Sequence, residues 1–486
     1  MLAQSRWLTL AVVSIALLLV VVDMTVLYTA LPSLALALHT TASEKLWILN
    51  AYSLVMAGLM PIMGALGDRL GHRPVFIYGM LLFAIASIVA AFAPNPSILI
   101  AARAALGIGG AAMLPTTIAI IRTTFQNPKE LALAIGVWTS VASGGAAIGP
   151  LLGGALLEHF WWGSVFLINV PIIGVATLLA LLFVPTRQGD RSIRIDAHSC
   201  WQSLLGIISL AFAIKEFAQP NSNQLLALST LLIGILTLIV FVRRQLSLEQ
   251  PLINFRLLSR APIATAIFVA FIASMVLIGF ELVLSQRLQL VLGKSPLEAG
   301  AFVLPISLGS FFASLITGVL MSRLSCISII SAGLALGAVG IWGYLLLPDS
   351  LLWPQVSALA VCGIGIGASL TAASTLLMSN VSGDQAGMAG SVEGVAYEFG
   401  GGFGVTLFGS IMTAIYVAQM QKSKVGSMAG SSIDEAILYA QTHSDSASIV
   451  QSATQAFESA FSGVSSIVIV ALFILSMVVL IAGRKI

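Results

Sequence analysis

The sequence contains very little charge. Only 8% of its 486 residues are Asp, Glu, Lys or Arg, whereas soluble proteins carry about 25%. In contrast, 58% of the residues are hydrophobic, and the mean hydropathy is +1.03. So little polar surface excludes a soluble globular protein. The composition predicts an all-α polytopic membrane protein, with the lipid bilayer as its first partner.

Features that other functions require are also scarce. The net charge is only +3, and the basic residues sit in short segments between apolar runs, so no nucleic-acid partner is expected. Cys200, Cys326 and Cys362 are scattered, which argues against a disulfide framework or a zinc site. The five histidines lack metal-ligand spacing, and no glycine-rich phosphate loop with a lysine is present. We therefore expect no enzyme activity, no metal, no cofactor and no bound ATP.

Apolar runs long enough to cross a membrane recur along the chain. A spanning helix needs about 20 apolar residues, and we count fourteen such runs. They lie near residues 7–31, 46–67, 74–93, 97–121, 131–157, 163–184, 199–218, 224–242, 261–286, 299–320, 327–347, 353–378, 389–416 and 461–483. The first run has the basic flank of a secretory signal, but it is too long and contains Asp23. We expect it to remain as the first helix.

The distribution of Lys and Arg predicts the orientation in the membrane, because cytoplasmic loops carry an excess of both. With a cytoplasmic N-terminus, fifteen basic residues fall inside and six outside. The inside set is Arg6, Arg69, Arg73, Arg122, Lys129, Arg187, Arg191, Arg194, Arg243, Arg244, Arg256, Arg260, Arg323, Arg484 and Lys485, and the outside set is Lys45, Lys215, Arg287, Lys294, Lys422 and Lys424. Both termini are therefore predicted to be cytoplasmic.

Two segments interrupt the alternation of spans and short connections. Residues 185–198 form a charged cytoplasmic linker after the sixth span, and residues 417–460 form one long external loop. Residues 433–439 and 449–457 in that loop show weak helical periodicity. A short amphipathic hairpin and a disordered loop both remain open for it.

The order of six, two and six spans suggests two homologous bundles with an inserted pair. We expect an N-terminal six-helix bundle in 1–184, a linker and two inserted helices with the following loop in 185–260, and a C-terminal six-helix bundle in 261–486. A weak internal repeat supports this division, since Gly64–Arg73 after the second span resembles Gly318–Leu324 after the tenth. Paired repeats are typical of secondary transporters, whose sites lie near the membrane midplane between the halves.

Asp23 lies inside the first span, and Arg103 lies inside the fourth. A charge in hydrocarbon costs roughly 2.5–3.5 kcal/mol, so each needs a partner, a watery cavity or a transported ion. At about 1.5 Å per residue, Asp23 lies roughly 12 Å and Arg103 roughly 9 Å from the outer surface. The two could therefore pair across the first bundle. The pair is either purely structural, or Asp23 exchanges protons while Arg103 tunes it.

Three further acids fall within spans. Glu398 lies roughly 14 Å from the inner end of the thirteenth span, near the midplane, and Glu393 is shallower. Five positions along a helix separate these two by about 140°, so they do not share a face. Depth favours Glu398 for a central cavity. Glu281 lies near the outer end of the ninth span, where it either reaches water directly or lines the substrate path.

A carboxyl group in the membrane can serve two purposes. An apolar environment favours its neutral form, so it can take up and release a proton, and its ionised form attracts an organic cation. One site that holds either a proton or a cation yields exchange directly. Aromatic rings could add cation–π surfaces, although each ring is more often a packing residue. The candidates are Tyr28, Trp138, Trp161, Trp162, Tyr397, Phe399 and Phe403.

The fifth span is rich in small residues. Gly144, Gly145, Gly149, Gly153 and Gly154 occur around Pro150. Small residues four apart let helices approach closely, and a proline kinks a span. The thirteenth span repeats the theme at Gly400, Gly401, Gly402 and Gly404, directly after Glu398.

Several of these segments resemble motifs of one family. GALGDRLGHR at 64–73 resembles the signature loop of the major facilitator superfamily, and RAALGIGGA at 103–111 resembles its fourth-helix motif. Residues 145–154 resemble the antiporter motif of its fifth helix. VVDMTVLYTALP at 21–32 resembles the first-helix motif of the fourteen-span drug:proton antiporters. FLINVP at 166–171 and QLVLGKSPLEAG at 289–300 resemble motifs of the same antiporters.

This resemblance implies the major facilitator fold and proton-coupled efflux by alternating access. Glu393 and Glu398 beside a glycine run resemble the quaternary-ammonium and methyl viologen exporters. The implied substrates are lipophilic organic cations: quaternary ammonium compounds, dyes, viologens and biguanides. The resemblance also implies a bacterial cytoplasmic (inner) membrane location, a proton gradient as the energy source and a monomer. One departure is Trp161-Trp162-Gly163-Ser164, where many relatives have an arginine between aromatic residues.

Three groups of residues receive roles from this interpretation. The proton-coupling residues are Asp23, Arg103 and Glu398, and the substrate-binding residues are Glu398, Glu393, Glu281, Asp23 and Tyr397. The conformational switch comprises Gly64, Asp68, Arg69, Gly71, Arg73, Gly145, Gly149, Pro150 and Gly153. Asp68 and Arg69 would latch the cytoplasmic side, and Asp68 could lie at a helix N-terminus, which favours a negative charge.

Two alternatives remain. The first is an uptake symporter or a dedicated metabolite exporter on the same fold. The fifth-span motif and the several membrane acids argue against uptake. The second is a membrane scaffold or receptor without transport. Four costly buried acids argue against an inert bundle.

Overall fold

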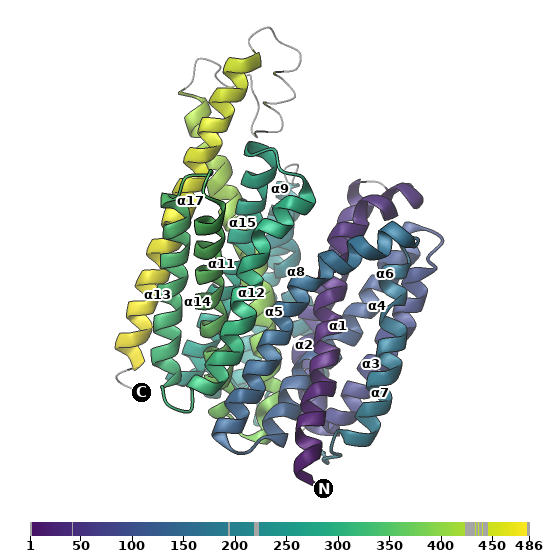
Figure 1. The fold of residues 1–486 in the computed structure, drawn as a ribbon. Helices are drawn as coiled ribbons and strands as arrows, with labels where there is room; N and C mark the ends of the chain where they lie inside the picture. Colours follow the sequence, from purple (N-terminus) through teal and green to yellow (C-terminus); the bar gives the residue numbers. More distant parts are fainter. Residues whose placement is uncertain are drawn as a thin grey trace.

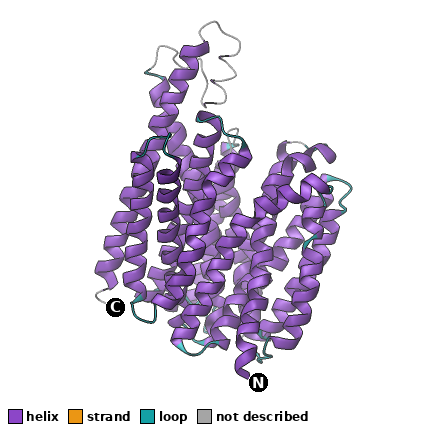
Figure 2. Cartoon of the chain, in the orientation of Figure 1, coloured by secondary structure: helices purple, strands orange, loops and turns teal. Residues whose placement is uncertain are grey.

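The computed structural model describes residues 2–40, 42–192, 195–217, 223–422 and 446–483, together with residues 433, 436 and 440. Every regular element in these ranges is helical, as Figure 2 shows. The helices in the first part of the chain are α1 Leu2–Ala37, α2 Ala42–Leu70, α3 His72–Ala91, α4 Pro96–Thr124, α5 Pro128–His159, α6 Ser164–Leu167, α7 Asn169–Phe183, α8 Ala197–Phe217 and α9 Gln224–Ser247. The remaining ones are α10 Phe255–Leu258, α11 Ala261–Gln286, η1 Arg287–Val291, α12 Pro296–Leu320, α13 Cys326–Leu346, α14 Leu352–Ser379, η2 Gly383–Gln385, α15 Ala386–Met420 and α17 Ser446–Gly483.

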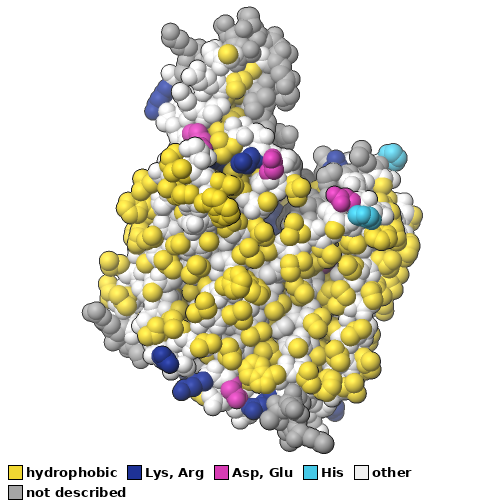
Figure 3. All heavy atoms as spheres, viewed as in Figure 1, with side chains coloured by type: hydrophobic (Ala, Val, Ile, Leu, Met, Phe, Trp, Pro, Cys, Tyr) yellow, Lys and Arg dark blue, Asp and Glu magenta, His cyan; other side chains and the backbone are white. Residues whose placement is uncertain are grey.

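Within the described residues, fourteen segments are long and apolar enough to cross a membrane, which confirms the predicted number. α6 and α7 together form one of these spans, and η1 extends α11. Figure 3 shows hydrophobic side chains over the body of the visible face, with the charged side chains gathered above and below them. The chain is a multi-pass membrane protein. Figure 1 places the N- and C-terminal ends on the same side, which we call the terminal side.

Local signals in the sequence set where several helices begin. The Asn95 side chain accepts a hydrogen bond from the Ile98 amide at 2.9 Å, and Pro96 occupies the first turn of α4. At the start of α12, Ser295 and Glu298 form a reciprocal capping box around Pro296. These contacts satisfy amide groups that have no partner within the helix. A proline in the first turn removes no helical hydrogen bond.

The helices fall into two halves, α1–α7 and α11–α17, which lie to the right and left in Figure 1. The halves meet along α5 with α12, and along α2 and α4 with α15. The inserted helix α8 packs on both α2 and α15 and thus covers one seam between the halves, whereas α9 packs mainly on α8. The predicted domain boundaries fall in connections, since α7 ends at Phe183 and α11 begins at Ala261. The division into domains itself stays a prediction.

The predicted external loop 417–460 is much shorter than expected on its C-terminal side. α15 continues to Met420, and α17 begins at Ser446 rather than near residue 461. The reason is an apolar stripe at helical spacing, since Ile449, Ala453, Ala456 and Phe457 are all at most 5% exposed. The periodicity noted at 449–457 is therefore a real helix. Most of residues 433–439 lie outside the described residues.

The ninth predicted span also differs from expectation. α11 passes into a turn of π-helix, Arg287–Val291, so the span continues to Val291. Glu281 therefore lies about 15 Å from the outer end instead of close to it. Arg287 secures this turn, because its guanidinium contacts Asp349 at 2.8 Å and Glu458 at 2.9 Å. These two ion pairs join α11 to the α13–α14 connection and to α17.

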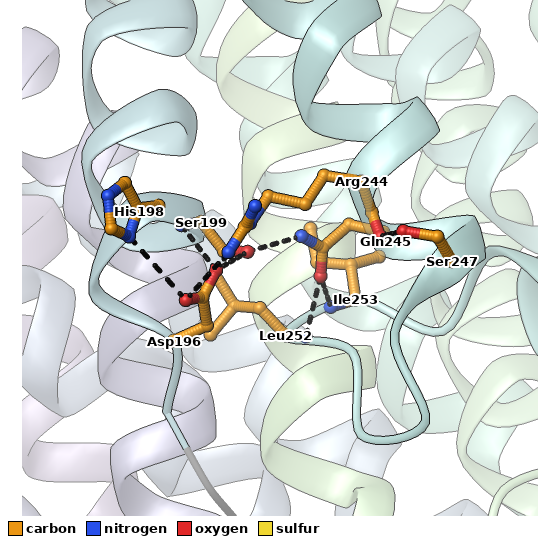
Figure 4. A network of polar contacts seen from close by, with 8 residues as sticks. All are labelled: Asp196, His198, Ser199, Arg244, Gln245, Ser247, Leu252 and Ile253. Carbon is orange, nitrogen blue, oxygen red and sulfur yellow. Dashed lines mark hydrogen bonds and ion pairs between the residues drawn. The ribbon is translucent and has the colours of Figure 1, made fainter.

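The inserted helices are held together near their terminal-side ends by a polar cluster around Asp196, which Figure 4 shows in close-up. Arg244 of α9 contacts Asp196 Oδ2 at 2.7 Å, and the Ser199 hydroxyl donates to the same oxygen at 2.6 Å. Gln245 donates to Ser199 at 2.7 Å and accepts from the Leu252 amide at 2.6 Å. α8, α9 and the following loop are thereby connected into one unit.

We expect Asp196→Asn to weaken this cluster in a pH-dependent way. Hydrogen bonds from Arg244 and then from Ser199 hold the pKa of Asp196 well below its ordinary value, which is about 3.9. A carboxyl group with a lowered pKa stabilises the fold above its unfolded pKa, and this contribution disappears as the pH falls. At pH 7 the variant should melt about 1–3 °C below wild type in detergent, because the ion pair is partly exposed.

The melting temperatures of wild type and Asp196→Asn should begin to converge as the pH falls below about 4, the unfolded pKa, and should meet only below the lowered pKa of the folded protein. Ser247→Ala is the matched control, since it removes a 2.8 Å hydrogen bond to the Arg244 carbonyl without removing an ionisable group. Its effect should not change with pH. A constant difference for Asp196→Asn from pH 7 to pH 3 would contradict the role given to its charge.

Candidate functional site

The pairing of Asp23 with Arg103 that depth suggested is present. Arg103 Nη1 of α4 lies 2.5 Å from Asp23 Oδ2 of α1, and the two side chains are 1% and 0% exposed. Arg103 Nε also donates to the Ile48 carbonyl of α2 at 3.3 Å. A fully buried pair of this kind needs such additional hydrogen bonds to offset the loss of hydration. The pair lies inside the first half, away from lipid.

Two residues complete this cluster that the sequence did not single out for a role. Asn169 Nδ2 donates to Asp23 Oδ1 at 3.1 Å and to Ser87 Oγ at 3.3 Å. The Tyr52 ring lies 4.5 Å from the Arg103 guanidinium, a cation–π distance. Asn169 occurs in the FLINVP segment quoted above, so the motif pointed to it. Tyr52 lies in an apolar helix with no local signal.

A second site lies where the two halves and the inserted pair meet. A small pocket is formed by side chains of α2, α8 and α15. Its lining comprises Ser53, Ala57, Ala211, Ile214, Lys215, Glu398, Phe399 and Gly402. Glu398 supplies the acidic group and Phe399 an aromatic ring. Glu393 does not line the pocket, in agreement with the prediction that the two acids point in different directions.

Tyr397 directly precedes Glu398 in the chain and lies near a second predicted acid, Glu281. It is 36% exposed although it occupies the middle of α15, and it lies within electrostatic range of both Glu281 and Glu398. Its carbonyl accepts a 2.7 Å hydrogen bond from Ser274 of α11. Glu393 lies one turn before Tyr397 on the same helix. The second half therefore places Glu281, Tyr397 and Glu398 in one neighbourhood.

Tyr52 connects the two sites. Asp23, Arg103 and Glu398 all act electrostatically on its hydroxyl group, which donates a 3.4 Å hydrogen bond to the Val20 carbonyl. Tyr52 therefore lies within electrostatic reach of both sites. In a medium of low dielectric constant such effects extend over longer distances than in water.

Asp68 joins the two halves on the terminal side. Its carboxylate accepts 3.0 Å hydrogen bonds from the amides of Gly387 and Met388, in the first turn of α15. The predicted position of Asp68 at a helix N-terminus is thus confirmed. A Cβ atom on Gly64 would collide with Gly387 and Ser391, so α2 and α15 approach closely only because residue 64 is a glycine. We call this contact the Asp68 latch.

The other switch candidates support the latch from within the first half. Gly71 has φ 96°, a left-handed conformation that favours glycine, and it lets the chain turn from α2 into α3. Arg73 donates to the Leu181 carbonyl at 2.6 Å and also to Thr186, which ties α3 to the end of α7. Arg69 precedes this turn and is half-buried.

The fifth helix uses its glycines for close packing, as expected from its composition. A Cβ atom on Gly145 would touch Leu18 and Val21 of α1, and one on Gly149 would overlap Thr25. On its other side, Ser143 and Ser310 of α12 form a 2.9 Å hydrogen bond between the halves. The backbone of Pro150 is helical, but its side chain lies outside the described residues, as does that of Tyr28.

Asp68→Asn should release the terminal-side contact between the halves. Hydrogen bonds from amides to a carboxylate contribute about 1.5–3 kcal/mol, and the neutral amide loses most of this. We expect a Cys at position 391, where Ser391 is 0% exposed, to react with a maleimide at least about tenfold faster in the variant. The experiment uses a background in which Cys200, Cys326 and Cys362 are replaced by alanine.

Asp190→Asn is the matched control for this labelling experiment. Among the described residues, the Asp190 side chain bonds within its own loop, to Ser192 at 2.6 Å, and the residue meets the latch through its backbone amide, which donates to the Asp68 carbonyl at 3.0 Å. Labelling at position 391 should then match wild type. Equal labelling in Asp68→Asn and Asp190→Asn would show that the Asp68 latch does not close this side.

The amino-acid sequence is similar to those of known membrane transport proteins. The family model of the Major Facilitator Superfamily matches residues 13–405. The methyl viologen resistance protein SmvA of Salmonella typhimurium is 39% identical over 443 residues, which is 90% of each chain. The multidrug efflux pump LfrA of Mycolicibacterium smegmatis is 37% identical, over 84% of this chain and 81% of that one.

Two solved structures share the fold at low sequence identity. The human organic anion transporter MFSD10 aligns with a TM-score of 0.63 and 15% identity, over 96% of this chain and 99% of that one. The proton:xylose symporter XylE aligns with a TM-score of 0.59 and 11% identity, over 96% and 95% of the two chains. The predicted fold of two six-helix bundles with two added helices agrees with these alignments.

Proposed function

The chain belongs to the major facilitator superfamily, and from this premise we propose that it is a proton-coupled multidrug efflux transporter that exports lipophilic organic cations by alternating access. The observation that carries the proposal is the position of Glu398. Its carboxylate lines a partly apolar pocket between α2 of one half and α15 of the other, next to Phe399. A partly buried acid beside an aromatic ring is suited to a lipophilic cation.

The relatives support this class of substrate. SmvA is named for resistance to methyl viologen, and LfrA is named as a multidrug efflux pump. Methyl viologen is an aromatic dication, which needs a carboxylate and an apolar surface for binding. Glu398 is the proposed central contact in this chain, with Glu281 and Tyr397 in its neighbourhood. The predicted contacts Glu393 and Asp23 do not line this pocket.

The Glu398 carboxyl group is also the proposed site of proton exchange. When Glu398 is ionised it holds the cation, and when a proton arrives from the outside the neutral acid releases it. The Asp23–Arg103 pair is the proposed second element of coupling. Its connection through Tyr52 lets the charge state of Glu398 influence the first half. The energy then comes from the proton gradient, and neither ATP nor another cofactor takes part.

Alternating access requires the halves to separate on one side at a time. In this structure the Asp68 latch joins them on the terminal side, and Arg122 Nη2 of α4 adds a 3.0 Å hydrogen bond to the Val381 carbonyl. We propose that this is the conformation from which a cation leaves toward the outside. The same assignment puts both termini in the cytoplasm of a bacterium, with the chain in the inner membrane as a monomer.

Inverted membrane vesicles test the proposal. Ethidium or methyl viologen, added after an interior-acid proton gradient is established, should discharge that gradient within seconds to minutes, and vesicles without the protein should not respond. A metabolite exporter or a symporter on the same fold would leave the gradient unchanged with every organic cation tested. That result would rule out the cation:proton exchange proposed here.

A further inference from the structure

The inserted helix α8 brings a positive charge to the proposed cation site. Lys215 lines the same pocket as Glu398, and its ammonium group acts electrostatically on that carboxylate. The sequence placed Lys215 at the outer end of a span, where a lysine normally reaches out to water. Here its ammonium group turns inward to α2 instead.

The ammonium group is held away from Glu398 by two polar side chains. Lys215 Nζ donates to Asn50 Oδ1 at 2.9 Å and to Ser53 Oγ at 2.6 Å. No ion pair of 4.0 Å or shorter joins it to Glu398, both residues being described. Lys215 therefore modifies the electric field of the pocket without filling the place of a ligand on the carboxylate.

Several contacts fix α8 in this position. The Thr406 hydroxyl of α15 donates to the Ile214 carbonyl at 2.7 Å. Trp47 of α2 stacks on Phe212 with ring centroids 5.6 Å apart. A Cβ atom on Gly58 of α2 would lie 2.7 Å from Ile208, so α2 and α8 approach closely. The end of α8 is thus clamped between the two halves, directly beside Lys215.

We propose that Lys215 is a specificity-determining residue that sets how strongly the Glu398 pocket discriminates between singly and doubly charged cations. This inference rests on the proposed function and deepens it. The interaction energy of a ligand with a fixed charge is proportional to the charge of the ligand. Repulsion from Lys215 therefore costs a bound dication twice the binding free energy that it costs a bound monocation. Because affinity depends exponentially on free energy, the fold-loss in affinity for the dication is the square of the fold-loss for the monocation.

The test compares dissociation constants of ethidium, a monocation, and methyl viologen, a dication, for the purified full-length protein in detergent at low salt. Removing the charge in Lys215→Gln should tighten ethidium binding roughly threefold to tenfold. Methyl viologen binding should tighten by about the square of the ethidium factor. The affinity ratio of the two ligands thus shifts toward methyl viologen by at least about threefold. Lys215→Arg keeps the charge and should leave the ratio as in wild type.

Asn50→Asp is the second variant, which keeps the assay informative if Lys215→Gln does not fold. The new carboxylate would pair with the Lys215 ammonium in place and neutralise its field, so the ratio should shift in the same direction. An unchanged ratio in the charge-removing variants would overturn the inference, as would equal changes in affinity for both ligands. If wild type binds neither ethidium nor methyl viologen, the proposed function fails instead.

Discussion

Glu398→Gln is expected to abolish cation:proton exchange. The glutamine keeps the size of the side chain but can neither bind a proton reversibly nor carry the negative charge that attracts the cation. Losing one partner of a desolvated charge pair costs about 2–5 kcal/mol, which corresponds to at least about a thirtyfold loss of affinity. Discharge of a preset proton gradient by ethidium or methyl viologen should therefore fall to the level of vesicles without the protein.

Glu393→Gln provides the matched control on the same helix. Glu393 is the same residue type five positions earlier, and it does not line the Glu398 pocket. We expect this variant to retain at least about a tenth of the wild-type rate, because it removes a charge from outside the pocket. Full exchange by Glu398→Gln, or equal loss in both variants, would contradict the assignment of Glu398 as the shared proton and cation site.

Stability gives an independent measurement on the same variant. An ionisable group in an apolar site costs free energy that a neutral amide of equal size largely avoids. The melting temperature of Glu398→Gln in detergent should therefore equal or exceed that of wild type. Lost transport with unchanged stability would separate a defect in the site from a defect in folding.

Replacement of Arg103 by Gln is expected to destabilise the protein strongly as well as to stop transport. The Asp23 carboxylate, which is 0% exposed, would be left without its counter-ion. Breaking a buried ion pair by removing one partner costs about 3–5 kcal/mol. Thermal unfolding in detergent should show a large decrease in melting temperature, and vesicles should show no cation-dependent proton flux.

The double variant Asp23→Asn with Arg103→Gln separates the two effects. Two neutral side chains of similar size can remain hydrogen-bonded, so most of the lost stability should return. Transport should stay absent if the pair takes part in coupling. Recovery of transport together with stability would mean that the pair is purely structural, which is the alternative that the sequence left open.

The ion pair between Arg6 and Glu130 is the matched control, because it lies in the same half of the protein as Asp23 and Arg103 but is partly exposed to solvent. Its atoms are 2.7 Å apart, but the side chains are 37% and 34% exposed. Ion pairs with this exposure contribute about 0–1 kcal/mol. Arg6→Gln should therefore change the melting temperature little and leave transport intact. If Arg6→Gln lowered the melting temperature as much as Arg103→Gln does, burial of the ion pair could not explain the instability of Arg103→Gln.

The sequence by itself determined the membrane class, the number of spans and which charged residues lie within spans. Hydropathy is a local property, because about 20 consecutive apolar residues suffice for one crossing. The charged residues within spans stand out because each is costly there. Depth follows from the rise per residue, and it correctly brought Asp23 and Arg103 to the same level.

Only the tertiary structure decided which residues share a site. Most of these helices are apolar on every side, so their sequences do not say which face meets lipid and which meets another helix. The turn of Lys215 toward Asn50 and Ser53, the bonding of Asn169 to Asp23 and the place of Tyr52 between two charged sites depend on helices far apart in the chain. Contacts of this kind arise from the packing of the two halves around the inserted pair, which no local pattern encodes.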